Sequence, residues 1–203
     1  LRCHNTARRV PAVGHCLRRA RGAGARPMKL GVDFSEHGGP LALPTVECWK
    51  QQGVRFAIVQ YSYLMNQHLT ILEQAGGLEV EAYVYLYWGQ DPWGQTPQIR
   101  TQNALHLAGS RISRLWLDAE YSGIPYREDQ LLECVMLCQN IGMPVGIYTG
   151  RWWWVPNTGN SPAFAHLPLW HAEYTAPDGA AESHPELAPD FNNFRPYGGW
   201  ARP

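Results

Sequence analysis

The chain has 203 residues, of which 45% are apolar, and this length suits one ordinary domain with a sizeable core. Its 17 lysines and arginines balance its 17 aspartates and glutamates, so net charge gives no reason to expect nucleic acid or an anionic membrane surface as a partner. The sequence contains no run of about 18 apolar residues, so no transmembrane helix is predicted.

The first 27 residues differ in composition from the rest of the chain. They contain seven arginines and no acidic residue, and they have no apolar core of the kind that a secretory signal needs. We expect residues 1–27 to be a disordered or artefactual extension, although their composition also resembles that of a transit peptide. The domain is therefore expected over residues 28–203.

Within residues 28–203, short segments of strand character alternate with segments of helical character. The predicted strands are Lys29–Ser35, Phe56–Ser62, Ala82–Trp88, Leu115–Glu120, Val145–Thr149 and Pro168–Tyr174. The predicted helices are Thr45–Gln52, Thr70–Ala75, Pro97–Gly109 and Arg127–Ile141. This alternation is typical of βαβ units that build a parallel sheet, so the expected fold class is α/β.

The spacing of the strands favours a β/α barrel of the TIM type. The competing architecture is an open doubly wound sheet, which usually carries a glycine-rich phosphate loop after its first strand. Here the first strand ends in Asp33-Phe34-Ser35, without such a loop. Beyond Tyr174 only one further strand is predicted, around Tyr197–Ala201. We therefore expect an irregular TIM-like β/α barrel that lacks its last strand in this chain.

Asp118 and Glu120 are the most informative pair of residues. They end the apolar strand Leu115–Glu120, where side chains two residues apart point to the same side. Mutual repulsion and poor solvation raise the pKa of one member of such a pair. One carboxyl can then act as a general acid while the ionised partner stabilises positive charge, as the cleavage of a glycosidic bond requires. The competing interpretation is a solvated strand end at which Glu120 pairs with an arginine.

Further candidates lie at the ends of other strands, where β/α barrels carry their active sites. Asp33 ends the first strand and would face the barrel mouth, unless it serves only as a helix cap or turn residue. Aromatic side chains at strand ends offer flat surfaces to sugar rings. The predicted substrate-binding residues are Tyr61, Tyr85, Tyr87, Tyr148 and Trp170. At least one of the consecutive tryptophans 152–154 is expected to line the cleft or cover a helix.

Six segments, in this order, resemble the family 25 glycoside hydrolases, the Chalaropsis-type lysozymes. They are Gly31-Val32-Asp33-Phe34-Ser35, Phe56-Ala57-Ile58-Val59, Ala82-Tyr83, Leu115-Trp116-Leu117-Asp118-Ala119-Glu120, Gly146-Ile147-Tyr148-Thr149 and Leu169-Trp170-His171-Ala172-Glu173-Tyr174. The resemblance covers residues 28–203 and implies an irregular β/α barrel.

The resemblance also implies an activity and roles for three carboxylates. The activity is hydrolysis, with retention, of the β-1,4 bond between N-acetylmuramic acid and N-acetylglucosamine in peptidoglycan. Glu120 would be the general acid, and Asp118 would either attack the anomeric carbon or orient the acetamido group of the substrate. Asp33 would balance the charge of the cluster and bind substrate. No cofactor and no metal are implied, and a monomer that acts outside the cell, or after release by lysis, is expected.

The sequence departs from the family pattern in three places. Gln60-Tyr61-Ser62 stands where K-A-[ST]-[EQ] is more frequent, and Tyr83-Val84-Tyr85 stands where Y-H-F is common. The W-Q-Y-S segment and the final D-x-N strand are absent, which predicts a C-terminally truncated domain of poor activity. Two alternatives follow from these departures: a carbohydrate-binding barrel without catalysis, and a glycosidase for another N-acetylhexosamine polymer such as chitin.

Overall fold

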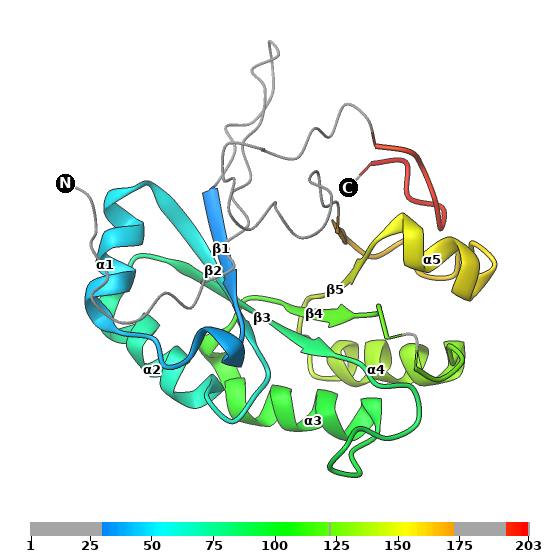
Figure 1. Ribbon diagram of the computed structural model, residues 1–203, viewed down its shortest axis with the longest axis horizontal. Helices are drawn as coiled ribbons and strands as arrows, with labels where there is room; N and C mark the ends of the chain where they lie inside the picture. The colour runs from blue at the N-terminus through cyan, green and yellow to red at the C-terminus, as the bar shows by residue number, and fades with distance from the viewer. Residues whose placement is uncertain (1–29, 122, 173–193, 203) are drawn as a thin grey trace. The chain divides into compact units, whose positions relative to one another are not determined.

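The computed structural model describes residues 30–121, 123–172 and 194–202 (Figure 1). The expected extension 1–27 lies outside these residues, as do the last two residues of the predicted strand Pro168–Tyr174. Contacts divide the described chain into two compact units, residues 30–80 and residues 81–172 with 194–202. The two units are described separately, and the predicted domain bounds 28–203 stay a prediction.

The first unit contains two parallel strands and two helices. Its elements are β1 (Leu30–Phe34), the short 3-10 helix η1 (Glu36–Gly38), α1 (Leu43–Gln51), β2 (Val54–Gln60) and α2 (Met65–Ala75). Strand β1 pairs with β2, with Asp33 opposite Ile58. The buried Phe34 contacts Trp49 of α1 and His68 of α2, so this side of β1 faces the helices.

Helix α2 is longer than predicted, because it begins at Met65 and not at Thr70. Met65, His68, Leu69 and Leu72 are all buried, and their spacing is that of one helical face. Inside this face, the His68 Nε2 atom lies 3.1 Å from the carbonyl oxygen of Gly39. The apolar periodicity was thus present in the sequence over the full length of the helix.

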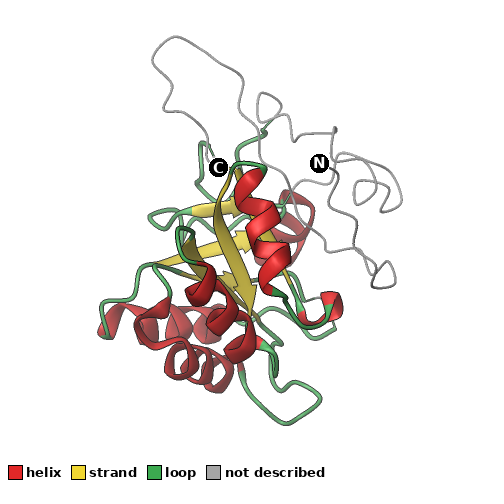
Figure 2. Cartoon of the chain, turned by 90° about the vertical axis from the view of Figure 1, so that its left-hand side faces the viewer, coloured by secondary structure: helices red, strands yellow, loops and turns green. Residues whose placement is uncertain are grey.

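The second unit contains parallel strands in chain order, with helices between them. Its elements are β3 (Glu79–Tyr85, which enters from the first unit), α3 (Pro97–Ala108), the 3-10 helix η2 (Gly109–Arg111), β4 (Leu115–Asp118), α4 (Glu128–Asn140), β5 (Val145–Thr149), α5 (Arg151–Thr158) and β6 (Leu169–His171). Strand β3 pairs with β4, β4 with β5, and β5 with β6. Helix α3 packs on α4, which contacts β4 and β5 (Figure 1). Figure 2 distinguishes the helices, in red, from the strands, in yellow.

Every residue of β4 is buried, which identifies this strand as the centre of the second unit. Side chains alternate along a strand, so Leu115 and Leu117 point to one side, and Trp116 and Asp118 point to the other. On the second side, the Trp116 Nε1–H donates to Glu81 Oε2 at 2.6 Å. A polar and aromatic layer therefore lies directly below Asp118.

Helix α5 was not predicted from the sequence. It contains three consecutive tryptophans and Pro156, which are poor signals for a helix because proline lacks the backbone N–H. Trp153 and Trp154 are almost fully buried, and this burial favours the helix over its weak intrinsic propensity. Trp153 lies 6.1 Å from Trp88, ring centre to ring centre.

The strand predicted around Tyr197–Ala201 is wrong. Tyr197 and Trp200 form a single antiparallel bridge, with Gly198 and Gly199 between them at positive φ angles of 56° and 78°. Glycine adopts such angles without a steric cost, so Tyr197-Gly198-Gly199-Trp200 forms a tight turn. Within the described ranges, no helix is both long and apolar enough to span a membrane.

Candidate active site

Four of the predicted site residues lie in one row across the four strands of the second unit. The pairing registers place Tyr85 beside Asp118, Asp118 beside Tyr148, and Tyr148 beside Trp170. Neighbouring residues in register point to the same face of a sheet. The row lies at the last residue of β3 and of β4, so it occupies the carboxyl end of the strands, where β/α folds carry their sites.

Glu120 lies two residues beyond the row and is partly buried. Burial raises the pKa of the Glu120 carboxyl to about 7, although a hydrogen bond from the backbone N–H of Gly150 opposes the rise. Burial is the largest cause that raises the pKa of Tyr85. The negative charge of Asp118 raises it further, and that of Glu120 does so to a smaller extent. The Tyr85 phenol therefore faces both carboxylates and stays protonated near neutral pH.

Residues at the end of β5 hold Glu120 from two directions. The hydroxyl of Thr149 donates to the carbonyl oxygen of Ala119 at 3.0 Å and so fixes the backbone that precedes Glu120. The next residue, Gly150, donates its backbone N–H to the Glu120 carboxylate. Gly150 is also the N-cap of α5, and a helix N-terminus favours negative charge. The Glu120 carboxyl is thus partly buried, but its ionised form is stabilised.

Tyr87 and Tyr121 extend the aromatic surface beside Tyr85. The ring centres of Tyr85 and Tyr87 lie 5.0 Å apart, and those of Tyr87 and Tyr121 lie 4.9 Å apart. Tyr85 and Tyr87 are among the residues predicted to bind substrate, whereas Tyr121 is not a candidate on the sequence alone. The available signal for Tyr121 was its position directly after the Asp118-Ala119-Glu120 motif.

Trp170 and Tyr148 form the other flank of Asp118. Their ring centres lie 4.5 Å apart, and Trp170 also contacts Trp116 at 5.7 Å. The absence of a side chain at Gly146 makes room for Trp116, because a Cβ there would lie 2.4 Å from the Trp116 ring. Tyr148 and Trp170 are both half-buried, so each combines packing with an exposed part of its ring.

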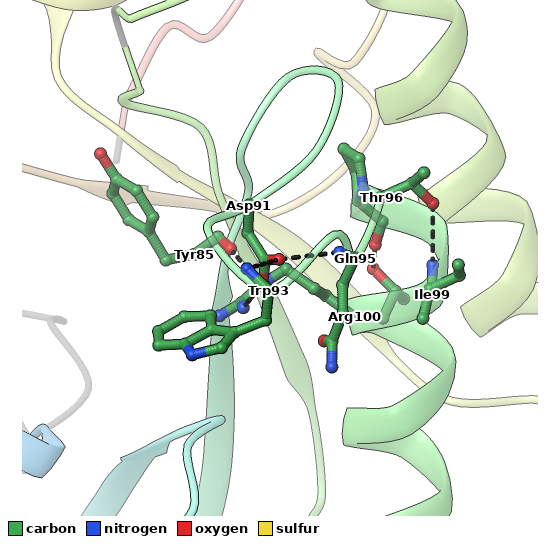
Figure 3. A network of polar contacts seen from close by, with 9 residues as sticks. Tyr85, Asp91, Trp93, Gln95, Thr96, Ile99 and Arg100 are labelled. Carbon is green, nitrogen blue, oxygen red and sulfur yellow. Dashed lines mark hydrogen bonds and ion pairs between the residues drawn. The ribbon is translucent and has the colours of Figure 1, made fainter.

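A buried ion pair organises the loop between β3 and α3 (Figure 3). Asp91 Oδ2 accepts from Arg100 Nη1 at 2.5 Å, and Asp91 Oδ1 accepts from the backbone N–H groups of Trp93 and Gln95. Arg100 also donates to the carbonyl oxygen of Tyr85 at 3.0 Å, and its guanidinium lies 5.3 Å from the Tyr87 ring centre. The sequence did not indicate this ion pair. Through Arg100 it holds the backbone at Tyr85 and contacts the ring of Tyr87.

The three consecutive tryptophans have two different environments. Trp153 and Trp154 are buried, while the side chain of Trp152 is 57% exposed. A Cβ on Gly150 would lie 2.2 Å from the indole nitrogen of Trp152, so this indole covers Gly150. Trp152 is therefore an exposed aromatic side chain next to the backbone amide that binds Glu120.

Asp33 and Tyr61 belong to the first unit. Asp33 is half-buried and lies on the side of β1 opposite Phe34, because side chains alternate along the strand. Tyr61 directly follows β2 and is also half-buried. Their positions at strand ends agree with the expected ones, while their roles stay predictions. In the described part of the chain, no group of three or more His, Cys, Asp or Glu residues could hold a metal ion.

Comparisons with known proteins identify relatives of this chain. A family model described as lysozyme-like protein 1 matches residues 25–203. The probable GH family 25 lysozyme 4 of Dictyostelium discoideum is 25% identical over 185 residues, which are 85% of this chain and 79% of the relative. Lysozyme-like protein 5 of Caenorhabditis elegans is 25% identical over 186 residues, which are 85% of this chain and 80% of that protein.

A solved structure has a similar fold. The modular Cpl-1 endolysin, crystallised with a peptidoglycan analogue, superposes with a TM-score of 0.58 at 20% sequence identity. The match covers 84% of this chain and 48% of the endolysin chain, so this chain spans about half the length of the endolysin. The likeness shows the expected fold, an incomplete β/α barrel of class α/β, of which the described residues supply six strands.

Proposed function

Because the chain belongs to the lysozyme-like proteins of glycoside hydrolase family 25, we propose that it hydrolyses the β-1,4 bond between N-acetylmuramic acid and N-acetylglucosamine in peptidoglycan. The observation that carries this proposal is the carboxylate pair Asp118 and Glu120, flanked by aromatic residues at the carboxyl end of parallel strands. The peptidoglycan analogue bound by the Cpl-1 endolysin supports the choice of polymer.

The two carboxyls have different proposed roles. Glu120, whose pKa burial raises to about 7, keeps its proton near neutral pH and gives it to the oxygen of the leaving sugar as the glycosidic bond breaks. As the leaving sugar departs, Asp118 either attacks the anomeric carbon or orients the acetamido group of the substrate to do so, and the intermediate that forms has the inverted configuration. Glu120 then takes a proton from the water molecule that displaces this intermediate from the side of the departed sugar, and the second inversion restores the original configuration.

The aromatic residues and Asp33 have proposed roles in substrate binding. Tyr85, Tyr87, Tyr148 and Trp170 would contact sugar rings around the cleaved bond, and Tyr61 of the first unit would also bind substrate. Asp33 would bind substrate and balance the charge of the carboxylates. We propose that the protein works as a monomer, needs no cofactor or metal, and meets its substrate outside the cell or after release by lysis.

Clearing of purified bacterial cell walls, followed by borohydride reduction of the products, tests this function. A muramidase leaves reduced muramic acid at the new chain ends, because its cut frees the reducing end of N-acetylmuramic acid. Release of sugars from chitin but not from cell walls would move the specificity to another N-acetylhexosamine polymer. Glycan binding by the folded protein without any cleavage would replace the enzyme by a carbohydrate-binding barrel.

The activity is expected to fall as the pH rises through about 7. The general acid must be protonated to act, and burial raises the pKa of Glu120 to about 7, so kcat/KM should decline roughly tenfold per pH unit above that value. Asp118, Tyr85 and Tyr197 are the other ionisable groups around it. A profile of kcat/KM against pH checks this expectation, and a decline that begins near the ordinary carboxyl pKa of about 4 would contradict it.

Trp152 is expected to contribute to substrate binding. Its indole is exposed and covers Gly150, whose N–H reaches Glu120, so a sugar held at the acid can stack on it. Stacking on an aromatic ring contributes about 0.5–1.5 kcal/mol, so Trp152→Ala should raise KM roughly 2- to 10-fold and change kcat little. Trp152→Phe keeps a flat ring and is the matched control. Equal KM values for Trp152→Ala and the wild type would remove Trp152 from the binding surface.

A further inference from the structure

The turn formed by Tyr197-Gly198-Gly199-Trp200 is anchored to the second unit by several contacts. Trp200 Nε1–H donates to the carbonyl oxygen of Leu167 at 2.9 Å, and the Gly198 N–H donates to Asn160 Oδ1 at 2.7 Å. The Trp200 ring also packs against Trp154 of α5, with ring centres 5.1 Å apart. Tyr197 is therefore held in one place and is only 2% exposed.

The hydroxyl of Tyr197 connects two residues of neighbouring strands. It donates its hydrogen to the carbonyl oxygen of Thr149 at 3.0 Å. It also lies 2.9 Å from Nδ1 of His171. Because a phenol has one hydrogen, and Thr149 receives it, Nδ1 of His171 must be the donor in the second bond. The direction of donation thus runs from His171 through Tyr197 to Thr149.

The peptide group that Tyr197 contacts is the one that binds the acid. The carbonyl oxygen of Thr149 and the N–H of Gly150 belong to the same peptide, and that N–H donates to the Glu120 carboxylate. A donor on the oxygen of a peptide polarises it and strengthens the bond made by its N–H. His171, Tyr197, the Thr149–Gly150 peptide and Glu120 therefore form one continuous series of hydrogen bonds.

We propose that Tyr197 and His171 are positioning residues for the general acid, and that they act on Glu120 through the Thr149–Gly150 peptide. The inference rests on the proposed function, in which Glu120 is the acid. Both residues act from behind the end of β5, since Tyr197 is buried and His171 is covered by the Phe194 ring, 5.0 Å away. In this role neither residue needs to contact the substrate.

This arrangement has a defined electrostatic consequence. The hydrogen bond from Gly150 stabilises the ionised form of Glu120 and lowers its pKa, against the larger effect of burial. Removing the Tyr197 hydroxyl weakens that bond and raises the pKa of Glu120 further. Tyr197 is itself one of the ionisable groups near Glu120, and two others, Asp118 of β4 and Tyr85 of β3, are untouched by this change. Burial also lowers the pKa of His171, but Nδ1 carries a hydrogen in either charge state in this arrangement.

The test measures the titration of Glu120 directly, by NMR of the 13C-labelled side-chain carboxyl in the full chain, assigned by its absence in Glu120→Gln. Tyr197→Phe removes the hydroxyl, and His171→Leu removes the first donor. His171→Asn is the conservative variant, because its amide nitrogen can occupy the position of Nδ1. Tyr126→Phe is the matched control, since Tyr126 is a half-buried tyrosine of the same unit whose hydroxyl has no partner within the described structure.

We expect the midpoint of Glu120 to rise by a few tenths of a pH unit in Tyr197→Phe, in line with a cooperative strengthening of about 10–30% per bond. A smaller rise is expected in His171→Leu, and none in His171→Asn or Tyr126→Phe. The decline of kcat/KM at high pH should move with the midpoint, while KM stays constant.

An unchanged Glu120 midpoint in folded Tyr197→Phe would overturn the proposal. If Tyr197→Phe fails to fold, the comparison of His171→Leu with His171→Asn tests the proposal instead. Equal Glu120 midpoints in these two variants would reject the proposal. Because the titration needs no substrate, its outcome is distinguishable from that of the activity test. If the variants shift the Glu120 midpoint as expected but the wild type clears no cell walls, the activity is refuted and the hydrogen-bond series stands.

Discussion

Glu120→Gln should lower the rate of cell-wall clearing by two to four powers of ten, which is the usual contribution of a general acid. Glutamine has nearly the same shape as glutamate, and it can still accept the hydrogen bond from Gly150, but it has no proton to give to the leaving group. The loss should therefore appear in kcat, with little change in KM. Initial rates of turbidity loss and a defined glycan substrate measure the two parameters.

The same variant should be more stable than the wild type at alkaline pH. The pKa of Glu120 is raised in the folded chain to about 7, whereas the unfolded chain ionises near the ordinary value, so the wild type loses stability as the pH rises between these two values. Glutamine cannot ionise and does not have this loss, so the Tm of Glu120→Gln at pH above 7 should exceed that of the wild type. An inactive variant with a lowered Tm would indicate a folding defect and not the loss of an acid.

Asp118→Asn should reduce kcat by roughly two to three powers of ten, the range found when one electrostatic partner of a transition state is removed. Asp118 is 5% exposed and lies in register between Tyr85 and Tyr148, so its charge acts where little water screens it. Asparagine keeps the shape but cannot stabilise positive charge at the anomeric carbon. A rate within a few-fold of the wild type would exclude Asp118 from the reaction.

Adding azide to Asp118→Ala separates the two mechanisms that remain for this carboxylate. If Asp118 is the nucleophile, azide can attack the anomeric carbon in its place and form a glycosyl azide of inverted configuration, which NMR identifies. If Asp118 orients the acetamido group of the substrate, that group remains the nucleophile and the product keeps its configuration. Tyr148→Phe is a suitable comparison, because it changes a neighbour of Asp118 in the same row without removing charge.

Much of the fold follows from local patterns in the chain. Strand β5 was predicted with its observed bounds, and α3 and α4 were predicted within one residue at each end. The bounds of α3 are marked by Thr96, whose hydroxyl caps the Ile99 N–H, and by Gly109. Helix α5 was missed because Pro156 and three adjacent tryptophans are unfavourable local signals. Burial of its tryptophans against distant residues such as Trp88 and Trp200 favours it.

The residue pattern alone was enough to identify the family, and it made the carboxylate pair and the aromatic strand ends candidates for the site. Those signals are local, since alternation along a strand sets which side chains share a face. The tertiary structure decided the register that aligns Tyr85, Asp118, Tyr148 and Trp170. It also decided the hydrogen bond of Tyr197 to Thr149, 48 residues away. The register and this hydrogen bond both depend on how distant segments pack. A hydrogen bond from a tyrosine hydroxyl to a backbone carbonyl produces no repeating pattern in the sequence, so it could not be predicted.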